Sequence, residues 1–215
     1  MTALLVAGGI GFAYPRSPQW VLRDFHLEVE RGQMVAVHGP SGAGKSTLLY
    51  LLGLFLAPSA GSVVFDGLDT VRLGDRERSL LRAHDIGFVL QDAALHADRT
   101  IRENVAEGAL YSGATMAAAG RHASDLLTRF GLGPIADRRP TEVSGGQAQR
   151  AALCRALIRH PQLILADEPT GNLDDANGRL IVASLREAAA SGTAVVVVTH
   201  AQALIEAADR TVALT

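Results

Sequence analysis

The stretch GPSGAGKST, Gly39 to Thr47, constrains this 215-residue chain more than any other feature of its sequence. It fills every fixed position of the phosphate-binding pattern GxxxxGK[ST]. The apolar segment MVAVH precedes it and STLLYLLGL follows it, which predicts a buried strand, a glycine-rich turn and a helix start in that order. The alternative is a glycine-rich turn with a solvated lysine, and the complete motif with both flanks disfavours it.

The chemistry of such a loop follows from its backbone. Glycines let the chain curl so that successive N–H groups point at phosphate oxygens, and the new helix adds its partial positive charge. We expect Lys45 to reach the β- and γ-phosphates and the Ser46 hydroxyl to ligate Mg²⁺. The predicted nucleotide-binding residues of the loop are Gly39, Pro40, Ser41, Gly42, Ala43, Gly44, Lys45, Ser46 and Thr47.

Two adjacent carboxylates end the apolar run LILADE, Leu163 to Glu168. A strand buried on both faces would deliver them at its carboxyl end, where open α/β sheets bind ligands. Asp167 is then predicted to hold Mg²⁺, directly or through water, and Glu168 to deprotonate the attacking water. Two solvated acids at a strand end are the alternative, which the phosphate loop in the same chain disfavours.

A third constellation is VSGGQAQR, Val143 to Arg150, placed before the helical run AALCRALIR. A serine and two glycines at a helix start form an anion-binding arrangement of the same physical kind as the phosphate loop. SGG alone is weak, because many helices begin this way. The SGG motif becomes specific here because GQAQR follows it and Asp167 lies seventeen residues beyond Arg150.

Composition excludes some classes of protein. The chain is 48% hydrophobic and 20% charged, which is ordinary for a globular protein, and its net charge of −2 argues against a broad nucleic-acid-binding face. We interpret the arginines of DRERSLLR as solvated charges. The single cysteine, Cys154, suggests a reducing compartment and a core position. No basic leader or bilayer-length apolar stretch occurs, so a membrane role would need a partner.

The order of the segments predicts one α/β domain with an insertion. Strands alternate with helices up to Gln91 and again from about residue 162, which indicates a mostly parallel sheet covered on both faces. Between them, alanine-rich helical runs predict a helical subdomain. We therefore expect a single domain of residues 1–215, with residues 1–91 and 162–215 as the core and residues 92–161 as the helical subdomain.

The chain resembles the ATPase subunits of ABC transporters over nearly its whole length. Its motifs follow the same order as in that family: the phosphate loop, SGGQ, LILADEPTGNLD and the strand ending at His200. The resemblance implies an α/β P-loop NTPase (RecA-like) core with a mainly parallel sheet, an N-terminal antiparallel β subdomain and an inserted α-helical subdomain. It implies ATP and Mg²⁺ as cofactors. Val143 stands where leucine is usual in the family.

The same resemblance implies roles for further residues. Tyr14 resembles the aromatic that stacks on adenine, although from spacing alone it is equally a surface packing residue. Gln91 resembles the glutamine that senses Mg²⁺, and His200 the histidine that contacts the γ-phosphate. Asp174 matches the aspartate of the loop that links two sites. The signature residues, which close over a nucleotide held by the second protomer, are Ser144, Gly145, Gly146 and Gln147.

Within the family, RRPTEVSGGQAQR, ADEPTGNLD and IGFVLQ are most similar to lipoprotein-releasing, macrolide-export and cell-division ATPases, with haem and peptide efflux ATPases beside them. We therefore expect an ATP hydrolase that forms a head-to-tail homodimer on the cytoplasmic face of a membrane and drives a separate transmembrane permease. Export of a hydrophobic or amphipathic substrate is the first expectation. Force transmission to a cell-wall or cell-division system is the alternative.

A soluble ABC-type machine acting on DNA or ribosomes is the rival from another class. No heptad run and no second ATPase half occur in the sequence, which disfavours it. Apolar residues near Gln91 without a regular core period predict a docking groove for a short helix of the membrane partner, with internal packing as the alternative. They are Ala93, Ala94, Leu95 and Ile101.

Overall fold

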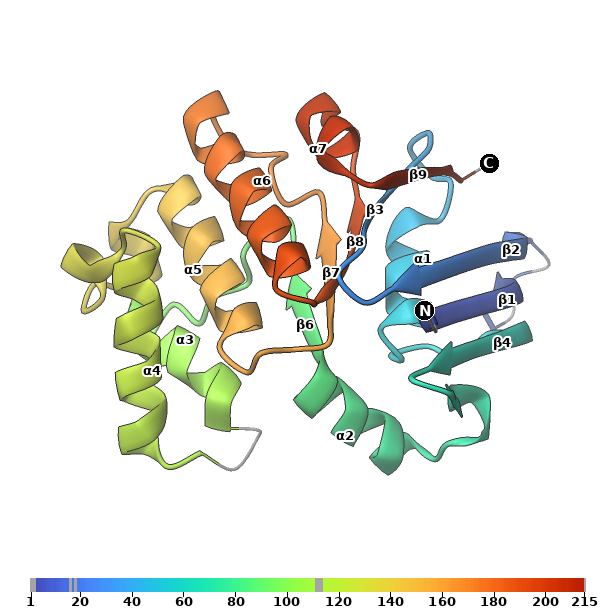
Figure 1. Cartoon of the computed structure of the whole chain (residues 1–215), viewed down its shortest axis with the longest axis horizontal. Coiled ribbons are helices and arrows are strands. Elements are labelled where there is room, and N and C mark those ends of the chain that lie inside the picture. The colour runs from blue at the N-terminus through green and yellow to red at the C-terminus, as the bar shows by residue number, and fades with distance from the viewer. Residues whose placement is uncertain (1–2, 16, 18, 111–113, 215) are drawn as a thin grey trace.

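A five-stranded parallel sheet, with strand order β6-β7-β8-β3-β9, lies at the centre of the molecule (Figure 1). The computed structural model describes residues 3–15, 17, 19–110 and 114–214, so residues 1, 2 and 215 of the predicted domain lie outside the described residues. Every pairing in this sheet is parallel. The strands are β3 (Met34–His38), β6 (Ile86–Val89), β7 (Leu163–Asp167), β8 (Ala194–Val198) and β9 (Arg210–Ala213).

The apolar runs of β3, β7 and β8 are continuous because both faces of the sheet are covered. All five residues of β8 are buried. Alternate side chains go to opposite faces, as the strand period requires. Val35 and Val196 join a core that includes helix α1 (Lys45–Leu52), whereas Met34 and Val197 join a core with helix α6 (Asp175–Ala190) and helix α7 (Gln202–Ala207).

A second sheet, antiparallel and of order β2-β1-β4-β5, is formed near the N-terminus and packs on the α1 side. Its strands are β1 (Ala3–Ala13), β2 (Trp20–Glu30), β4 (Ala60–Phe65) and β5 (Leu68–Asp69). In β2 the residues from Phe25 to Val29 alternate between buried and exposed, as expected where one face is solvated. Phe25, Leu27 and Val29 thus enter the same core as α1.

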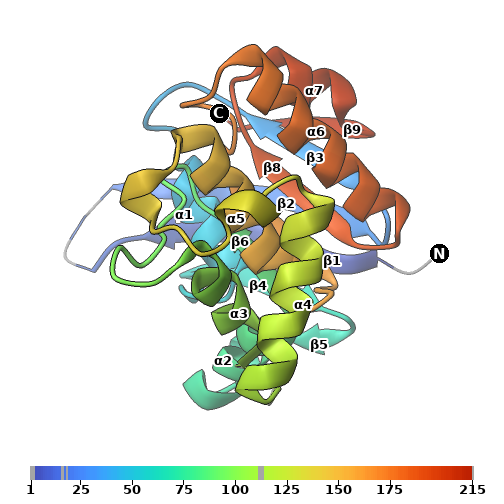
Figure 2. The same cartoon turned by 90° about the vertical axis from the view of Figure 1, so that its left-hand side faces the viewer.

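Three helices between β6 and β7 form a third hydrophobic cluster of their own. They are α3 (Ile101–Leu110), α4 (Met116–Arg129) and α5 (Gly145–Leu157), and Figure 2 shows them in front of the sheet. We call the described residues between Gln91 and Gln162 the helical insertion. The parallel core, the antiparallel sheet and these helices confirm the predicted fold class. The exact boundaries at residues 91 and 162 stay a prediction.

The remaining elements are helix α2 (Asp75–Asp85), with no buried residue, and short 3-10 turns at Thr70–Arg72, Gly133–Ile135 and Pro140–Glu142. Strand β6 ends at Val89, two residues before the predicted end at Gln91. No helix in the described ranges combines the length and apolar character that crossing a membrane requires.

The predicted docking residues mostly face inward. Ile101 is completely buried in the cluster of the helical insertion, Ala93 is buried, and Leu95 packs partly against the same cluster. Ala94 is exposed. The prediction was therefore wrong for Ile101 and Ala93, because Ile101 packs into the core of the helical insertion and Ala93 is buried rather than on an open surface.

Candidate active site

The phosphate loop joins the end of β3 to the start of α1. Gly42 and Gly44 have φ values of 83° and 89°, a region that favours glycine. A Cβ at Gly44 would lie 2.8 Å from Cγ1 of Val21 in β2, and one at Gly39 would lie 2.3 Å from the carbonyl oxygen of Leu214. Close neighbours therefore require glycine at Gly39 and Gly44, and the backbone conformation favours it at Gly44 as well.

Lys45 and Ser46 are the first two residues of α1. The Lys45 ammonium donates to the carbonyl oxygens of Gly39 (2.8 Å) and Pro40 (3.0 Å), so it lies folded over the loop. The Ser46 hydroxyl interacts with the Asp167 carboxylate at the end of β7 and lowers the pKa of that group. The start of α1 and the end of β7, 121 residues apart in sequence, thus meet at one point.

Asp167 has an unfavourable environment for a negative charge. Burial raises the pKa of its carboxyl group above the usual value, and the neighbouring Glu168 carboxylate raises it further. The Ser46 hydrogen bond and the Lys45 charge act in the opposite direction. A divalent cation would relieve this penalty, and hydroxyl and carboxylate oxygens are the ligands that Mg²⁺ prefers. The Ser46 hydroxyl and the Asp167 carboxylate therefore offer the kind of ligands that Mg²⁺ binds.

Glu168 lies immediately beyond β7 with a strained backbone. Its φ of 41° is rare for a residue with a side chain. One carboxylate oxygen, Oε2, accepts from the Thr199 hydroxyl (3.1 Å) and the His200 backbone N–H (3.2 Å). The other, Oε1, is buried and has no hydrogen-bond partner, but it lies 3.5 Å from Nε2 of His200, with which it forms an ion pair when that imidazole is protonated. A buried carboxylate oxygen that accepts no hydrogen bond is suited to accept one from water.

Thr199 is a functional residue that the sequence reasoning missed. It is fully buried at the end of β8, donates to Glu168 and accepts from the backbone N–H of Ala201 (2.9 Å). These bonds fix the orientation of the Glu168 carboxylate and the turn that carries His200. The only signal in the sequence is a threonine directly after four valines, too common to single out.

Tyr14 lies just past the end of β1, with 45% of its surface exposed. Its hydroxyl is 3.1 Å from that of Thr47, the third residue of α1. The phosphate loop and the predicted adenine-stacking residue are thus in direct contact, although 33 residues separate them.

The signature residues begin helix α5. Ser144 is its N-cap and exchanges hydrogen bonds with Gln147: the Gln147 N–H donates to the Ser144 hydroxyl and the Ser144 N–H to the Gln147 side chain. A Cβ at Gly146 would lie 2.5 Å from Asn177 of α6, whereas one at Gly145 would meet open space. Ser144 and Gly145 are exposed, so they present the helix start to solvent.

Asp174 and Gln91 make no hydrogen bond to Lys45 or Asp167 within the part of the chain that the structure describes. Asp174 caps α6, accepting from the backbone and side-chain nitrogens of Asn177 (both 2.8 Å), and these bonds lower the pKa of its carboxyl group. Gln91 is exposed, and its side-chain nitrogen would be 3.6 Å from a Cβ at Gly171. Gln91 and Gly145 line a cleft of about 230 Å³ with the turn at Pro169–Leu173.

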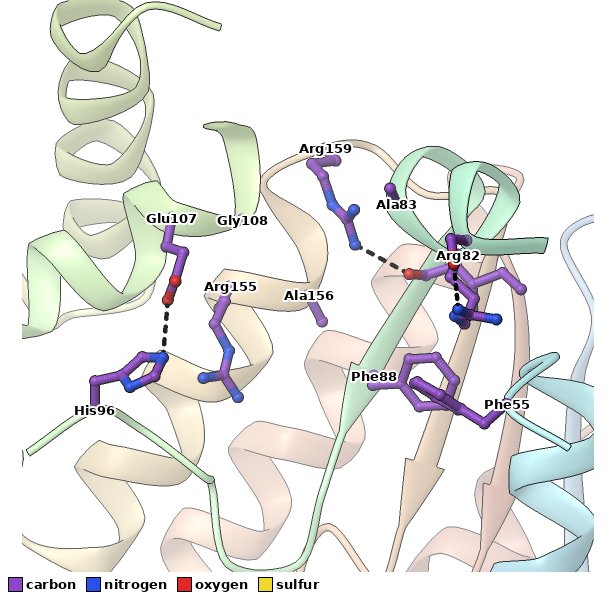
Figure 3. Close-up of a pocket in the computed structure, with 12 residues that line it drawn as sticks. Phe55, Arg82, Ala83, Phe88, His96, Glu107, Gly108, Arg155, Ala156 and Arg159 are labelled. Atoms are coloured by element: carbon purple, nitrogen blue, oxygen red, sulfur yellow. Dashed lines mark hydrogen bonds and ion pairs between the residues drawn. The ribbon is translucent and has the colours of Figure 1, made fainter. Parts of the chain in front are cut away.

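A separate groove of about 530 Å³ lies between the core and the helical insertion (Figure 3). Phe55 and Phe88 form one wall, with ring centroids 4.8 Å apart, and Arg82 of α2 lies over the Phe55 ring. Opposite them the figure shows Glu107 of α3 beside His96. Arg82 donates to Leu54 and Ser79, so the interpretation of this arginine as a solvated charge was wrong.

Comparison with known proteins agrees with this geometry. The ABC transporter family profile matches residues 22–171. The lipoprotein-releasing system ATP-binding protein LolD of Myxococcus xanthus is 46% identical, over 88% of this chain and 85% of that protein. The macrolide export ATP-binding/permease protein MacB of a Shewanella species is 42% identical over 88% of this chain, which spans only 29% of that longer protein.

Among solved structures, the dimeric ATP-binding cassette MJ0796, in a post-hydrolysis state bound to ADP and Pi, superposes with a TM-score of 0.91. The two sequences are 32% identical, and the match covers 98% of this chain and 94% of that one. The phosphate loop, the Asp167–Glu168 pair and the signature all lie within the residues matched to the family profile. The chain therefore belongs to the ABC transporter family, as an ATP-hydrolysing subunit.

Proposed function

We propose that the chain binds ATP with Mg²⁺ through the phosphate loop and Asp167 and hydrolyses it with Glu168 as general base. The observation that carries this proposal is the buried Oε1 of Glu168, which accepts no hydrogen bond and lies beside Asp167, the carboxylate that interacts with Ser46. Lys45 then leaves the carbonyls of Gly39 and Pro40 for the β- and γ-phosphates. Tyr14 stacks on adenine.

The cation site is formed by Ser46 and Asp167, with Gln91 approaching from the loop after β6. When bound, Mg²⁺ neutralises charge on the β- and γ-phosphates. The chain's own groups do the rest: the loop N–H groups orient the phosphates, Glu168 takes the proton of the attacking water, and His200 contacts the γ-phosphate. Thr199 keeps Oε2 of Glu168 occupied, so that Oε1 remains available.

A second copy of the chain completes the site. Ser144 and Gly145 are exposed at the start of α5, where helix N–H groups attract an anion. We infer a head-to-tail homodimer in which these residues, with Gly146 and Gln147, close over the nucleotide of the partner, and Asp174 lies in the loop between the two sites. The dimeric structure of the cassette MJ0796 supports a homodimer.

The groove of Figure 3 is the proposed docking site for a short cytoplasmic helix of a transmembrane permease. Its aromatic wall offers apolar contact, with Phe55 54% exposed. Three arginines and one glutamate are among its lining residues (Arg82, Arg155, Arg159 and Glu107). An acidic side chain on the docking helix would complement this charge. The protein would thereby be held on the cytoplasmic face of a membrane.

The proposed transport process is export or extraction of a hydrophobic or amphipathic substrate. Lipoprotein release is the first candidate, because the LolD relative is 46% identical over most of both chains. Macrolide export is the second, on the likeness to MacB. Force transmission to a cell-wall system through a membrane partner remains the alternative. Finding whether the co-purified complex moves a substrate, and which one, would decide between these processes.

Arg82→Glu tests the docking proposal, with Arg76→Glu on the same helix but outside the groove as its control. We expect Arg82→Glu to lose the membrane protein that co-purifies with the wild-type chain, identified by mass spectrometry. Arg76→Glu should retain it, and both variants should keep their basal ATPase activity. Equal retention by the two variants would contradict the proposed groove. Leu95→Asp is a poor test, because Leu95 packs against the core of the helical insertion.

A further inference from the structure

The Tyr14–Thr47 hydroxyl pair joins the two sheets at the nucleotide site. Tyr14 follows the antiparallel strand β1, whereas Thr47 belongs to the helix that continues the phosphate loop. Their oxygens are 3.1 Å apart, and either hydroxyl can donate. Thr47 is only 7% exposed, so little water competes for its hydroxyl.

Two further features restrict the Tyr14 backbone, and one contact restricts its ring. Pro15 follows it and disfavours a helical backbone at Tyr14. The Tyr14 carbonyl accepts from the Ser17 N–H (3.0 Å), which closes a turn. The Phe12 ring packs edge-on, with centroids 5.0 Å apart and planes at 85°. The backbone and one side of the ring are thus held, and the Thr47 hydroxyl holds its far end.

We infer that Thr47 is a positioning residue for adenine: its hydroxyl holds the Tyr14 ring at a set distance from the phosphate loop before nucleotide binds. The inference rests on the proposed ATP site, in which the half-exposed Tyr14 ring stacks on the base. A ring already held in place loses less conformational freedom on binding, so the nucleotide binds more tightly. The hydroxyl pair therefore acts on affinity and not on the chemical step.

The test compares Tyr14→Phe, Thr47→Val and the double variant by calorimetric titration with ATP in the absence of Mg²⁺, where no hydrolysis occurs. Tyr14→Phe keeps the ring and removes only the hydroxyl. We expect it to raise the Kd for ATP about two- to tenfold, the range of one hydrogen bond. In the Thr47→Val background the same change should have no effect. Thr47→Ser should restore the wild-type Kd.

Two further readouts separate positioning from general stability. Inorganic tripolyphosphate, which has no base, should bind wild type and Tyr14→Phe equally. In steady-state kinetics Tyr14→Phe should raise KM for ATP with kcat unchanged. The inference is overturned by an unchanged Kd in Tyr14→Phe, by the same loss in both Thr47 backgrounds, or by an equal loss for tripolyphosphate.

Tyr14→Ala distinguishes this inference from the proposed function. Removing the whole ring should weaken ATP binding about tenfold or more, as for a lost base–aromatic stack, and leave tripolyphosphate binding intact. If Tyr14→Ala binds ATP as tightly as wild type, adenine stacking itself is wrong. If Tyr14→Ala weakens binding but Tyr14→Phe does not, stacking stands and the role of Thr47 is wrong.

Discussion

The groups around Asp167 and the groups around Ser144 are held in different ways. Asp167 and Glu168 end a strand of which four residues are buried, and their partners come from distant segments at Ser46 and Thr199. Ser144 and Asp174 are exposed helix caps whose hydrogen bonds stay within their own first turns. The first set is fixed by contacts across the fold of one chain, whereas the second is exposed to solvent.

This contrast indicates that the two sets of residues have different roles. Proton transfer needs groups placed to a fraction of an ångström, which a buried sheet edge supplies. Closure of a dimer needs groups that can exchange partners at low cost, which solvated caps supply. Variants in the first set should therefore affect the chemical step within one protomer, and variants in the second should affect assembly.

The largest effect is expected for Glu168→Gln. The amide keeps the size of the side chain but cannot take a proton, so turnover should fall about 10²- to 10⁴-fold while ATP binding is retained. The nucleotide-bound dimer should accumulate and be visible by size-exclusion chromatography. Glu206→Gln, an exposed position on α7, is the matched control and should hydrolyse ATP normally. Turnover within a fewfold of wild type would place the base elsewhere.

Mixing Lys45→Ala with Ser144→Arg tests whether the two regions act across the dimer. Each variant alone should be inactive, because every site carries one lesion. In a mixed dimer one site carries both lesions and the other none, so random exchange should restore about a quarter of wild-type activity. ATP binding by Ser144→Arg should stay intact before mixing. A loss as severe as that of Lys45→Ala would show that the signature acts within one chain.

Asp167→Asn should raise the stability of the nucleotide-free protein while it removes the response to Mg²⁺. The pKa of Asp167 is raised in the folded state, so more protons are bound there than in the unfolded chain and stability falls as the pH rises through that range. Near neutral pH the neutral amide avoids this penalty. We expect Tm to rise by roughly 1 to 3 °C, after allowance for solvent screening.

Thermal unfolding with and without Mg-ATP checks this prediction. Wild type should gain stability from Mg-ATP at pH 7, and Asp167→Asn should gain far less. Below the usual carboxyl pKa the two proteins should unfold at the same temperature, because Asp167 is then protonated in both states. A lower Tm for Asp167→Asn at pH 7 would mean that the carboxylate stabilises the fold.

The smallest effect is expected at the ion pair between Arg129 of α4 and Glu187 of α6, which bridges the helical insertion and the core. Both side chains are more than half exposed. A double-mutant cycle with Arg129→Ala and Glu187→Ala should give a coupling free energy of about 0.2 to 1 kcal/mol, and high salt should reduce it. A coupling free energy well above that range would show that the Arg129–Glu187 ion pair holds the two regions together.

The sequence by itself determined the local elements of the site. A complete phosphate-loop motif between a strand and a helix, and two acids after an apolar run, require only neighbouring residues to be recognised. Ser144 was predictable for the same reason, since a helix cap is a local structure. The family profile and the alternating strands and helices confirm the fold class that these elements predicted.

Tertiary structure decided which distant residues meet. The contacts of Ser46 with Asp167, Thr199 with Glu168 and Tyr14 with Thr47 each join segments at least 31 residues apart. Strand order brings them together, and a one-dimensional pattern carries no strand order. The fold likewise buries Ile101 inside the helical insertion and leaves a groove beside Phe55. Whether an apolar side chain is core or surface depends on what packs against it, which only the folded chain supplies.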